Sequence, residues 1–397
     1  MSSSSSQNIS QALEEAKARY VVRNAKSKSL HEEATKSFPG GNTRTVLHTS
    51  PFPISMKSGK GYQLTSEDGH VYTDLTAEFT AALYGHSNPV ILDAVNNVLN
   101  NVGLNIGATT PQEQLFAREL CRRFDLERVR FTNSGTEANL HALAVARLVT
   151  KKRKVVVFNK GYHGGVLMFW GGKPAPNNVD PDDWIIVKYN DLDAAVKAIQ
   201  SEGVAAVLME ASGLAGLRGI KPDLKTFGKY LGGGLAFGGF GGRADIMGAF
   251  DPRQTPSIPH SGTFNNNTLV THAGYAGLTK IYTLDIADKF FKIGESFISK
   301  LQETVEGTRL GFSGVGSILC SRFVDGDTEV KDIKCADDFT ENEALKDLFW
   351  FEMLEQGFWI TRRGLIALVL ETPQSELDRF VGAVQAFVSK YDDVLAF

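Results

Sequence analysis

Two segments of the chain carry residue types that can do chemistry together. The first, residues 130–139, indicates a strand that passes through a Ser134-Gly135-Thr136 turn into a helix. Unpaired backbone N–H groups and the positive end of a helix dipole favour a phosphate at such a turn, and the hydroxyls of Ser134 and Thr136 can add to its binding. A purely structural interpretation is also open, in which Ser134 or Thr136 only caps the helix.

The second segment places Lys229 between a short apolar strand and the glycine cluster 232–234. Partial removal of water lowers the pKa of a lysine and makes its neutral amine available for a Schiff base. The structural alternative is a surface lysine beside a flexible loop. The nearby pattern Gly239-x-Gly241-x-x-Ala244 also fits a relaxed dinucleotide fingerprint, but no strand-to-helix context or ribose-binding acid accompanies it.

An α/β scaffold is expected to position these segments. Between about 89 and 270, helical patterns alternate with short β-branched runs, which predicts a mostly parallel, buried sheet with strands at 129–132, 155–158, 184–189 and 204–209. A leading helix is expected within residues 8–37, and short antiparallel strands within 54–75. A helix-rich tail follows from about 271 and includes a strand-like run at 365–370.

Composition narrows the class of protein. The 397 residues exceed one ordinary core, and fractions of 42% hydrophobic and 22% charged residues are typical of globular chains. The 42 Lys and Arg nearly balance the 45 Asp and Glu, so a nucleic-acid partner is not expected. Cys121, Cys320 and Cys335 lack the spacing of a metal site or a disulfide framework. Without a signal peptide or an apolar run of membrane-spanning length, the expected location is the cytoplasm.

Four motifs occur in the order seen in class III aminotransferases. They are Ser134-Gly135-Thr136-Glu137-Ala138, Gly161-Tyr162-His163-Gly164, Lys229-Tyr230-Leu231-Gly232-Gly233-Gly234 and His260-Ser261-Gly262-Thr263-Phe264-Asn265-Asn266-Asn267. The chain resembles this family from about Phe38 to its C-terminus, most closely glutamate-1-semialdehyde aminomutase and the β-amino-acid aminotransferases. The resemblance implies a fold-type I pyridoxal-5′-phosphate enzyme with a large α/β domain and a smaller α+β domain formed by both chain ends. The implied division is a tail and helix at 1–37, the first part of the small domain at 38–88, the large domain at 89–270 and the helix-rich rest at 271–397.

The resemblance also implies roles for individual residues. Lys229 would hold the cofactor as a Schiff base and move the proton between substrate and cofactor carbons. Gly135 and Thr136, with Ser134 beside them, would bind the cofactor phosphate. Tyr162 would stack on the cofactor ring, since an aromatic face suits a flat heterocycle.

Other residues are implied to reach the site from elsewhere. Thr263 would contact the phosphate of the neighbouring subunit's cofactor, which implies a homodimer with shared sites; its structural alternative is an ordinary turn hydroxyl. Arg44 resembles the arginine that meets the substrate carboxylate, and a guanidinium fork suits that planar anion; a surface arginine is the alternative. Arg362 and Arg363 are further candidates between which the sequence does not choose. His163 is expected to be structural, because the cofactor is the electron sink and the lysine moves the proton.

One motif of the family is absent. Its members place an Asp-Glu-Val-like segment on a central strand before the lysine, and the aspartate keeps the pyridine ring protonated. Here the chain runs from Glu210 to Gly219 without it, as if a few tens of residues were missing. Loss of an interior strand and a crossover helix should expose apolar surface or force direct pairing across the gap. Glu210 is the nearby acid at a strand end, but we do not expect it to replace the aspartate.

Two hypotheses of different classes follow. The first is an active pyridoxal-phosphate aminotransferase that moves an amino group between an amino acid or related amine and an oxo-acid acceptor, with an aminomutase as a close variant. The second is a truncated, catalytically impaired homologue. A continuous message without the Asp-Glu-Val segment would support the second.

Overall fold

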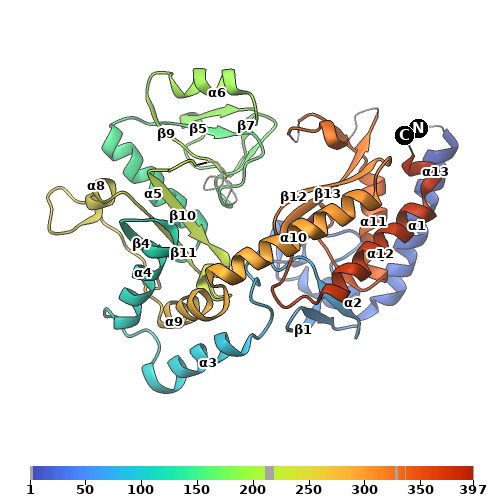
Figure 1. Ribbon diagram of the computed structural model, residues 1–397, viewed down its shortest axis with the longest axis horizontal. Helices are drawn as coiled ribbons and strands as arrows, with labels where there is room; N and C mark the ends of the chain where they lie inside the picture. The colour runs from blue at the N-terminus through green and yellow to red at the C-terminus, as the bar shows by residue number, and fades with distance from the viewer. Residues whose placement is uncertain (1–2, 211–218, 327–329, 336, 397) are drawn as a thin grey trace. The chain divides into compact units, whose positions relative to one another are not determined.

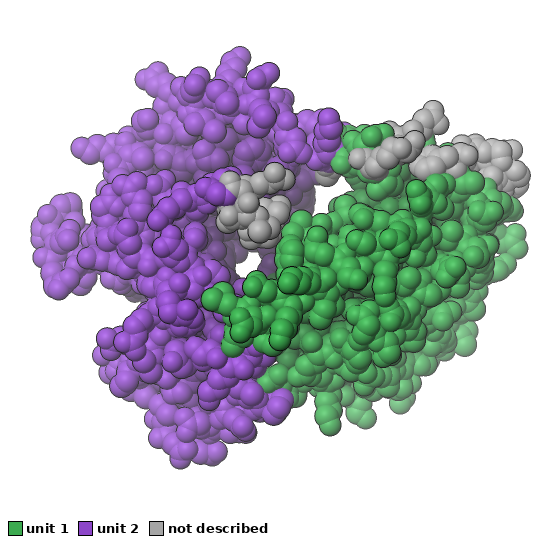
Figure 2. Space-filling model, in the orientation of Figure 1, with its two compact units in different colours: residues 1–88, 282–333, 338–397 green, residues 89–281, 334–337 purple. Residues whose placement is uncertain are grey.

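The chain divides into two compact units. The computed structural model describes residues 3–210, 219–326, 330–335 and 337–396. Unit 1 comprises Met1–Asn88, Tyr282–Ile333 and Asp338–Phe397, and unit 2 comprises Pro89–Ile281 and Lys334–Asp337 (Figure 2). The four motifs that carry the candidate chemistry therefore all belong to unit 2. Within the described ranges, no helix combines the length and the apolar character needed to cross a membrane.

Unit 1 combines helices with two small sheets. The expected leading helix is present in two pieces, α1 (Ser3–Arg23), which begins inside the serine tract, and α2 (Ala25–Ala34). The expected antiparallel strands are also present, and one late strand joins them in parallel; the order is β1 (Met56–Lys60), β2 (Gln63–Ser66), β3 (Val71–Asp74) and β15 (Phe358–Trp359). The chain thus brings its two ends into one sheet.

The second sheet of unit 1 comes from the C-terminal third of the chain. Its strands are β12 (Leu310–Val315), β13 (Ile318–Asp325), β14 (Thr340–Glu341) and β16 (Leu365–Ala367), the last within the predicted strand-like run. Helix α10 packs on β12, helix α11 on β13, and helix α12 on α10; their bounds are Leu284–Thr304, Glu343–Glu355 and Gln374–Lys390, with the short α13 (Asp392–Leu395) at the end.

In the described residues, unit 2 contains two separate three-stranded sheets and one short hairpin of β6 (Phe169–Trp170) and β7 (Lys173–Pro174). One three-stranded sheet is parallel, with the order β8 (Trp184–Val187), β5 (Lys154–Phe158), β9 (Val204–Val207). In the other, a central strand runs antiparallel to both neighbours, in the order β10 (Leu224–Gly228), β11 (Gly238–Gly242), β4 (Arg128–Thr132) (Figure 1). All four predicted strands are present, but β4 lies in a different sheet from the other three. Among the described residues, no pairing joins the sheet of β9 to the sheet of β10, and this break is called the interruption of the sheet below.

Helix α5 (Gly135–Thr150) packs against both sheets. Ala138, Ala142 and Val145 form a core with Phe240 of β11, whereas Leu143 packs with Val155 of β5. One helix thus serves two hydrophobic cores. The other α-helices among the described residues of the unit are α3 (Pro89–Asn97), α4 (Pro111–Phe124), α6 (Leu192–Ile199), α8 (Ala244–Met247) and α9 (Thr268–Ala276).

Apolar side chains are exposed on both sides of residues 211–218. Val207 of β9 is 43% exposed and Ile220 is 50% exposed, whereas Val156 in the central strand β5 is fully buried. Among the described residues, β9 and β10 do not pair with each other. Residues 211–218, where the deletion is inferred, lie outside the described ranges. The loss of an interior strand and helix stays a prediction.

Candidate active site

The turn at 134–136 lies between the end of β4 and the first residue of α5. The Ser134 hydroxyl accepts a hydrogen bond from Glu137 N (3.2 Å) and donates one to Glu137 Oε1 (3.3 Å). Glu137 Oε2 in turn accepts from Asn133 N (2.9 Å). The capping interpretation therefore holds for Ser134. In the described part of the chain, the N–H groups of Gly135 and Thr136 have no acceptor, so they remain available to an anion at the helix N-terminus.

The loop at 161–165 packs on this turn. Thr136 Oγ1 accepts from Gly165 N (3.3 Å), and its own proton is left for a second partner. Gly164 has a positive φ of 125°, and a Cβ there would collide with the Thr136 side chain. Asn139 Nδ2 donates to the carbonyl of His163 (2.8 Å). Two residues of α5, Thr136 and Asn139, thus hold the backbone of the second motif against the first.

Lys229 follows the last residue of β10, beside the same turn. A Cβ built on Gly228 would lie 3.5 Å from Gly135 N, so the end of β10 touches the start of α5. Lys229 has a φ of 61°, in the left-handed region that non-glycine residues rarely adopt. The expected partial burial of Lys229 is wrong for the single chain, where the residue is exposed. The structural alternative, a surface lysine after the strand, therefore describes Lys229 in the single chain.

Tyr162 and Glu210 are joined by a contact that the sequence did not predict. Tyr162 is 54% exposed, and its backbone N–H donates to Glu210 Oε2 (2.9 Å). Glu210 follows the end of β9, which places a carboxylate against the aromatic residue of the second motif. The position of Glu210 at a strand end indicated a residue near the site. The sequence spacing could not show that its hydrogen-bond partner is the backbone N–H of Tyr162.

The fourth motif also reaches the turn. Asn265 Oδ1 accepts from Asn133 Nδ2 (3.1 Å), and Asn265 Nδ2 lies 3.3 Å from His260 Nε2. Thr263 is exposed, and no hydrogen bond of its hydroxyl occurs within residues 3–210 or the other described ranges. The structure therefore brings the motif, though not the Thr263 hydroxyl, into contact with the turn of the same chain.

Two histidines within the motifs, His163 and His260, are held neutral. Burial lowers the pKa of His163 to about 4. Burial, followed by the neighbouring His141 and Arg130, lowers the pKa of His260 to about 4 as well. The His141 and His260 ring centroids are 4.5 Å apart. Because both pKa values lie well below neutrality, these rings contribute no positive charge at pH 7.

The three candidate substrate arginines belong to unit 1 and differ in their partners. Arg44 forms an ion pair with Glu78, and both side chains are exposed. Arg362 makes a two-point contact with Asp347 and also donates to the carbonyl of Ser50 (2.7 Å), so it is committed to packing within unit 1. The Arg363 guanidinium lies 4.9 Å from the Phe79 ring centroid.

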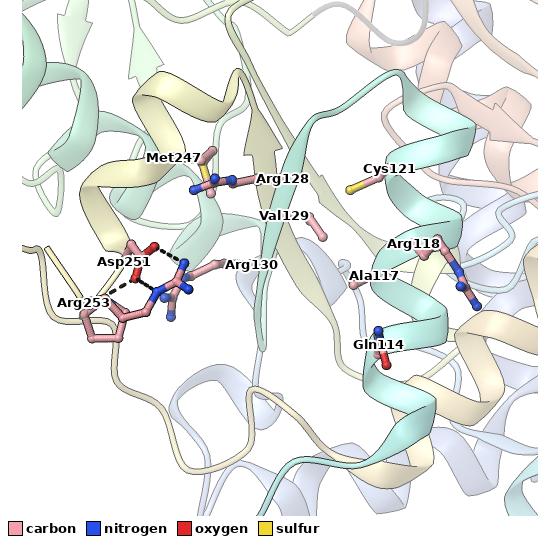
Figure 3. Close-up of a pocket in the computed structure, with 11 residues that line it drawn as sticks. Gln114, Ala117, Arg118, Cys121, Arg128, Val129, Arg130, Met247, Asp251 and Arg253 are labelled. Atoms are coloured by element: carbon pink, nitrogen blue, oxygen red, sulfur yellow. Dashed lines mark hydrogen bonds and ion pairs between the residues drawn. The ribbon is translucent and has the colours of Figure 1, made fainter.

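A depression of about 550 Å³ lies at the start of β4, at the end of the strand far from the 134–136 turn (Figure 3). It is separate from the candidate active site. In Figure 3, Arg128 and Arg130 lie on the same side of the depression as Asp251, and Arg118 points away from them. The Arg253 guanidinium donates two hydrogen bonds to the Asp251 carboxylate, at 2.9 and 2.6 Å. None of the candidate site residues lines this depression.

Comparison with known proteins identifies the family. The family model "Aminotransferase class-III" matches residues 46–171 and 210–364. The chain is 40% identical to an uncharacterized aminotransferase of Schizosaccharomyces pombe over 96% of both chains, and 39% identical to the β-phenylalanine transaminase of Variovorax paradoxus over 98% of both. A glutamate-1-semialdehyde 2,1-aminomutase of Alkaliphilus metalliredigens is 28% identical over 86% of this chain and 90% of its own. The crystal structure of the Variovorax enzyme superposes with a TM-score of 0.92 at 37% identity, covering 98% of this chain and 99% of that one.

The chain belongs to the class III aminotransferase family. It is a pyridoxal-phosphate-dependent aminotransferase of fold type I. The alignment with the yeast relative extends over 427 positions although this chain has 397 residues, so at least 30 aligned positions have no counterpart here. This difference supports the inference that an internal segment is missing.

Proposed function

We propose that this chain binds pyridoxal phosphate among the 134–136 turn, the 161–165 loop and Lys229, and transfers an amino group between an amino acid and an oxo acid. The observation that carries the proposal is the convergence of these segments within unit 2. Gly228 lies against Gly135, and Gly164 lies against Thr136. Residues from three distant motifs thereby border one place, which the proposed domain 89–270 contains.

The phosphate end of the cofactor fits the residues present. The N–H groups of Gly135 and Thr136 and the positive end of α5 suit a dianion, and the Thr136 hydroxyl can donate one further hydrogen bond. Ser134 contributes indirectly, because its hydroxyl is used to fix the turn through Glu137. Thr263 is proposed to supply a hydroxyl to the phosphate of a neighbouring subunit.

The aldehyde end fits Lys229, because a primary amine forms a Schiff base with an aldehyde. When bound, the cofactor supplies the electron sink for the substrate carbanion. Lys229 Nζ would take the proton from the substrate carbon and deliver it to the cofactor carbon. Tyr162 would cover one face of the ring and exclude water from it.

The ring nitrogen is the part of the cofactor with the poorest fit. Glu210, the acid at the end of β9, already accepts the Tyr162 N–H. Together with the interrupted sheet, this favours the second candidate function, a cofactor-binding homologue with impaired transfer. The two candidates differ in whether the loaded protein accepts an amino group from a donor.

The proposed substrate carries a carboxylate that Arg44 binds. Because Arg44 already pairs with Glu78, a substrate carboxylate must compete with that side chain. β-Phenylalanine is the first donor to test, since a relative of that specificity matches nearly the whole chain. An intramolecular amine shift, as in the aminomutases, remains the alternative reaction on the same residues.

We also propose a homodimer. The apolar residues Leu99, Leu104 and Ile106 are 53%, 49% and 45% exposed, as is Phe264 at 54%. Two hydrogen bonds connect this region to the segment after Thr263: Thr268 Oγ1 donates to the carbonyl of Gly103 (3.0 Å), and Asn266 Nδ2 to that of Ala108 (3.2 Å). A partner subunit bound to this surface would lie beside Thr263.

The cytoplasmic location is also a proposal, which cell fractionation would test.

The test of the function is cofactor attachment followed by donor screening. Protein incubated with pyridoxal phosphate and reduced with borohydride should carry the cofactor on the peptide that contains Lys229, and Lys229→Ala should carry none. Addition of β-phenylalanine should then convert the visible absorption of the loaded protein to that of the aminated cofactor. Loading without any conversion across a panel of amino donors would establish the impaired homologue instead.

A further inference from the structure

Side chains from within and outside α5 hold the backbone of the 161–165 loop, and one from outside, Asn177 Nδ2, donates to the carbonyl of Gly165 (2.9 Å). Thr136 accepts from Gly165 N and Asn139 donates to the carbonyl of His163, both from the first turns of α5. Glu210 accepts from Tyr162 N at 2.9 Å. Side chains therefore hold the loop at residues 162, 163 and 165, and Glu210 holds the point nearest the Tyr162 ring.

The carboxylate of Glu210 has this hydrogen bond as its one recorded partner among the described residues. It lies at the end of β9, an edge strand beside the interruption of the sheet. Burial, and to a smaller extent the nearby carboxylate of Glu210, raises the pKa of Tyr189 to about 12. A charged acceptor makes a stronger hydrogen bond to an amide than a neutral acceptor does. Glu210 is thus well suited to fix the peptide group that carries Tyr162.

We propose that Glu210 is a positioning residue for cofactor binding, which acts by holding the backbone of Tyr162 so that its ring covers the cofactor. The inference rests on the proposed role of Tyr162. It differs from a direct role as the acid partner of the ring nitrogen, because positioning requires only a hydrogen-bond acceptor. A ring-nitrogen partner must instead carry a negative charge.

Two substitutions separate these roles. Glu210→Gln keeps an acceptor oxygen of the same reach but removes the charge, whereas Glu210→Ala removes both. Glu202→Ala is the matched control, because Glu202 is an exposed acid at the other end of β9 with no recorded partner among the described residues.

The first measurement uses cofactor-free protein. Hydrogen exchange of the peptide that contains residues 159–166 should be fastest in Glu210→Ala and intermediate in Glu210→Gln, which keeps a neutral acceptor, while Glu202→Ala should exchange like the parent. The second measurement is the dissociation constant for pyridoxal phosphate, from titration of its visible absorption. It should rise about tenfold in Glu210→Ala, as loss of a charged hydrogen bond predicts, and stay within about threefold of the parent in Glu210→Gln.

Three results would overturn the proposal. Unchanged exchange in Glu210→Ala would show that the loop does not depend on Glu210. If Glu210→Gln and Glu210→Ala weakened cofactor binding equally and altered the pH titration of the visible band equally, the charge of Glu210 would be needed. Glu210 would then be the partner of the ring nitrogen and not a positioning residue. Unchanged binding in Glu210→Ala would remove any role. If the parent itself bound no cofactor, the proposed function would fail, and the exchange measurement would still decide whether Glu210 holds the loop.

Discussion

At the residue scale, Lys229 combines a reactive amine with an unfavourable backbone conformation. A left-handed φ of 61° costs a residue with a Cβ roughly 1–2 kcal/mol, whereas glycine adopts it freely. Such conformations persist where surrounding structure enforces them, often at functional sites. The extended strand β10 and the glycine cluster after Lys229 set this conformation, because the chain must turn at that point.

Comparison of two variants isolates the backbone contribution of this residue. Lys229→Gly and Lys229→Ala both remove the amine, so they differ mainly in backbone freedom. We expect the glycine variant to be more stable by about 1 kcal/mol, the reverse of the usual order in regular structure. Urea denaturation of the two cofactor-free proteins measures the difference. A more stable alanine variant would show that φ at 229 is not left-handed.

His163 gives a pH dependence of stability. Its pKa is about 4 in the folded chain, below the usual 6.5, so between these values the unfolded chain binds a proton that the folded chain does not. The free energy of unfolding should therefore fall as pH falls from 6.5 toward 4, with about 1–2 kcal/mol lost through this group by pH 5. Above pH 7 the group has no effect. Denaturation at pH 7 and pH 5 should show a smaller loss in His163→Gln than in the parent; an equal loss would contradict the assignment.

At the element scale, a strand at the edge of a sheet tolerates polar side chains better than a buried central strand does. Val207 lies on an open edge strand, and Val156 lies fully buried in the central strand β5. Replacing Val by Thr adds a hydroxyl, which costs about 1–3 kcal/mol where it is buried without a partner and little where water reaches it.

The same substitution at both positions therefore tests the interruption. Val156→Thr should lower the free energy of unfolding by about 1–3 kcal/mol, and Val207→Thr by less than about 0.5 kcal/mol. Denaturant unfolding of each variant gives both values. A large loss for Val207→Thr would mean that the edge of β9 is covered in the folded protein.

At the scale of the whole molecule, the proposed dimer depends on the exposed apolar residues around 99–106. Leu104→Asp should place a charge in that interface and raise the dimer dissociation constant at least tenfold, roughly the effect of one important contact. Leu192, 77% exposed at the start of α6, provides the control as Leu192→Asp. Sedimentation equilibrium measures both. A Leu104→Asp protein as dimeric as the control would place the interface elsewhere.

The sequence by itself determined the family, the cofactor and the four predicted strands of the large domain. These three conclusions follow from local sequence patterns. A glycine-rich turn, a lysine before a glycine cluster and a β-branched run can each be identified from residues that are neighbours in the chain. It also indicated a missing segment between Glu210 and Gly219. The proposed roles of Lys229, Thr136 and Tyr162 stay predictions for experiment.

Only the tertiary structure decided how the remaining strands pair and which polar groups meet. The division of the strands into two sheets depends on pairing between segments far apart in the chain, which no local pattern specifies. The exposure of Lys229, the commitment of Arg362 to Asp347 and the contact of Glu210 with Tyr162 N likewise depend on distances across the fold. Residue type limits what a side chain can bind, but its partner is set by what folding places within a few ångströms of it.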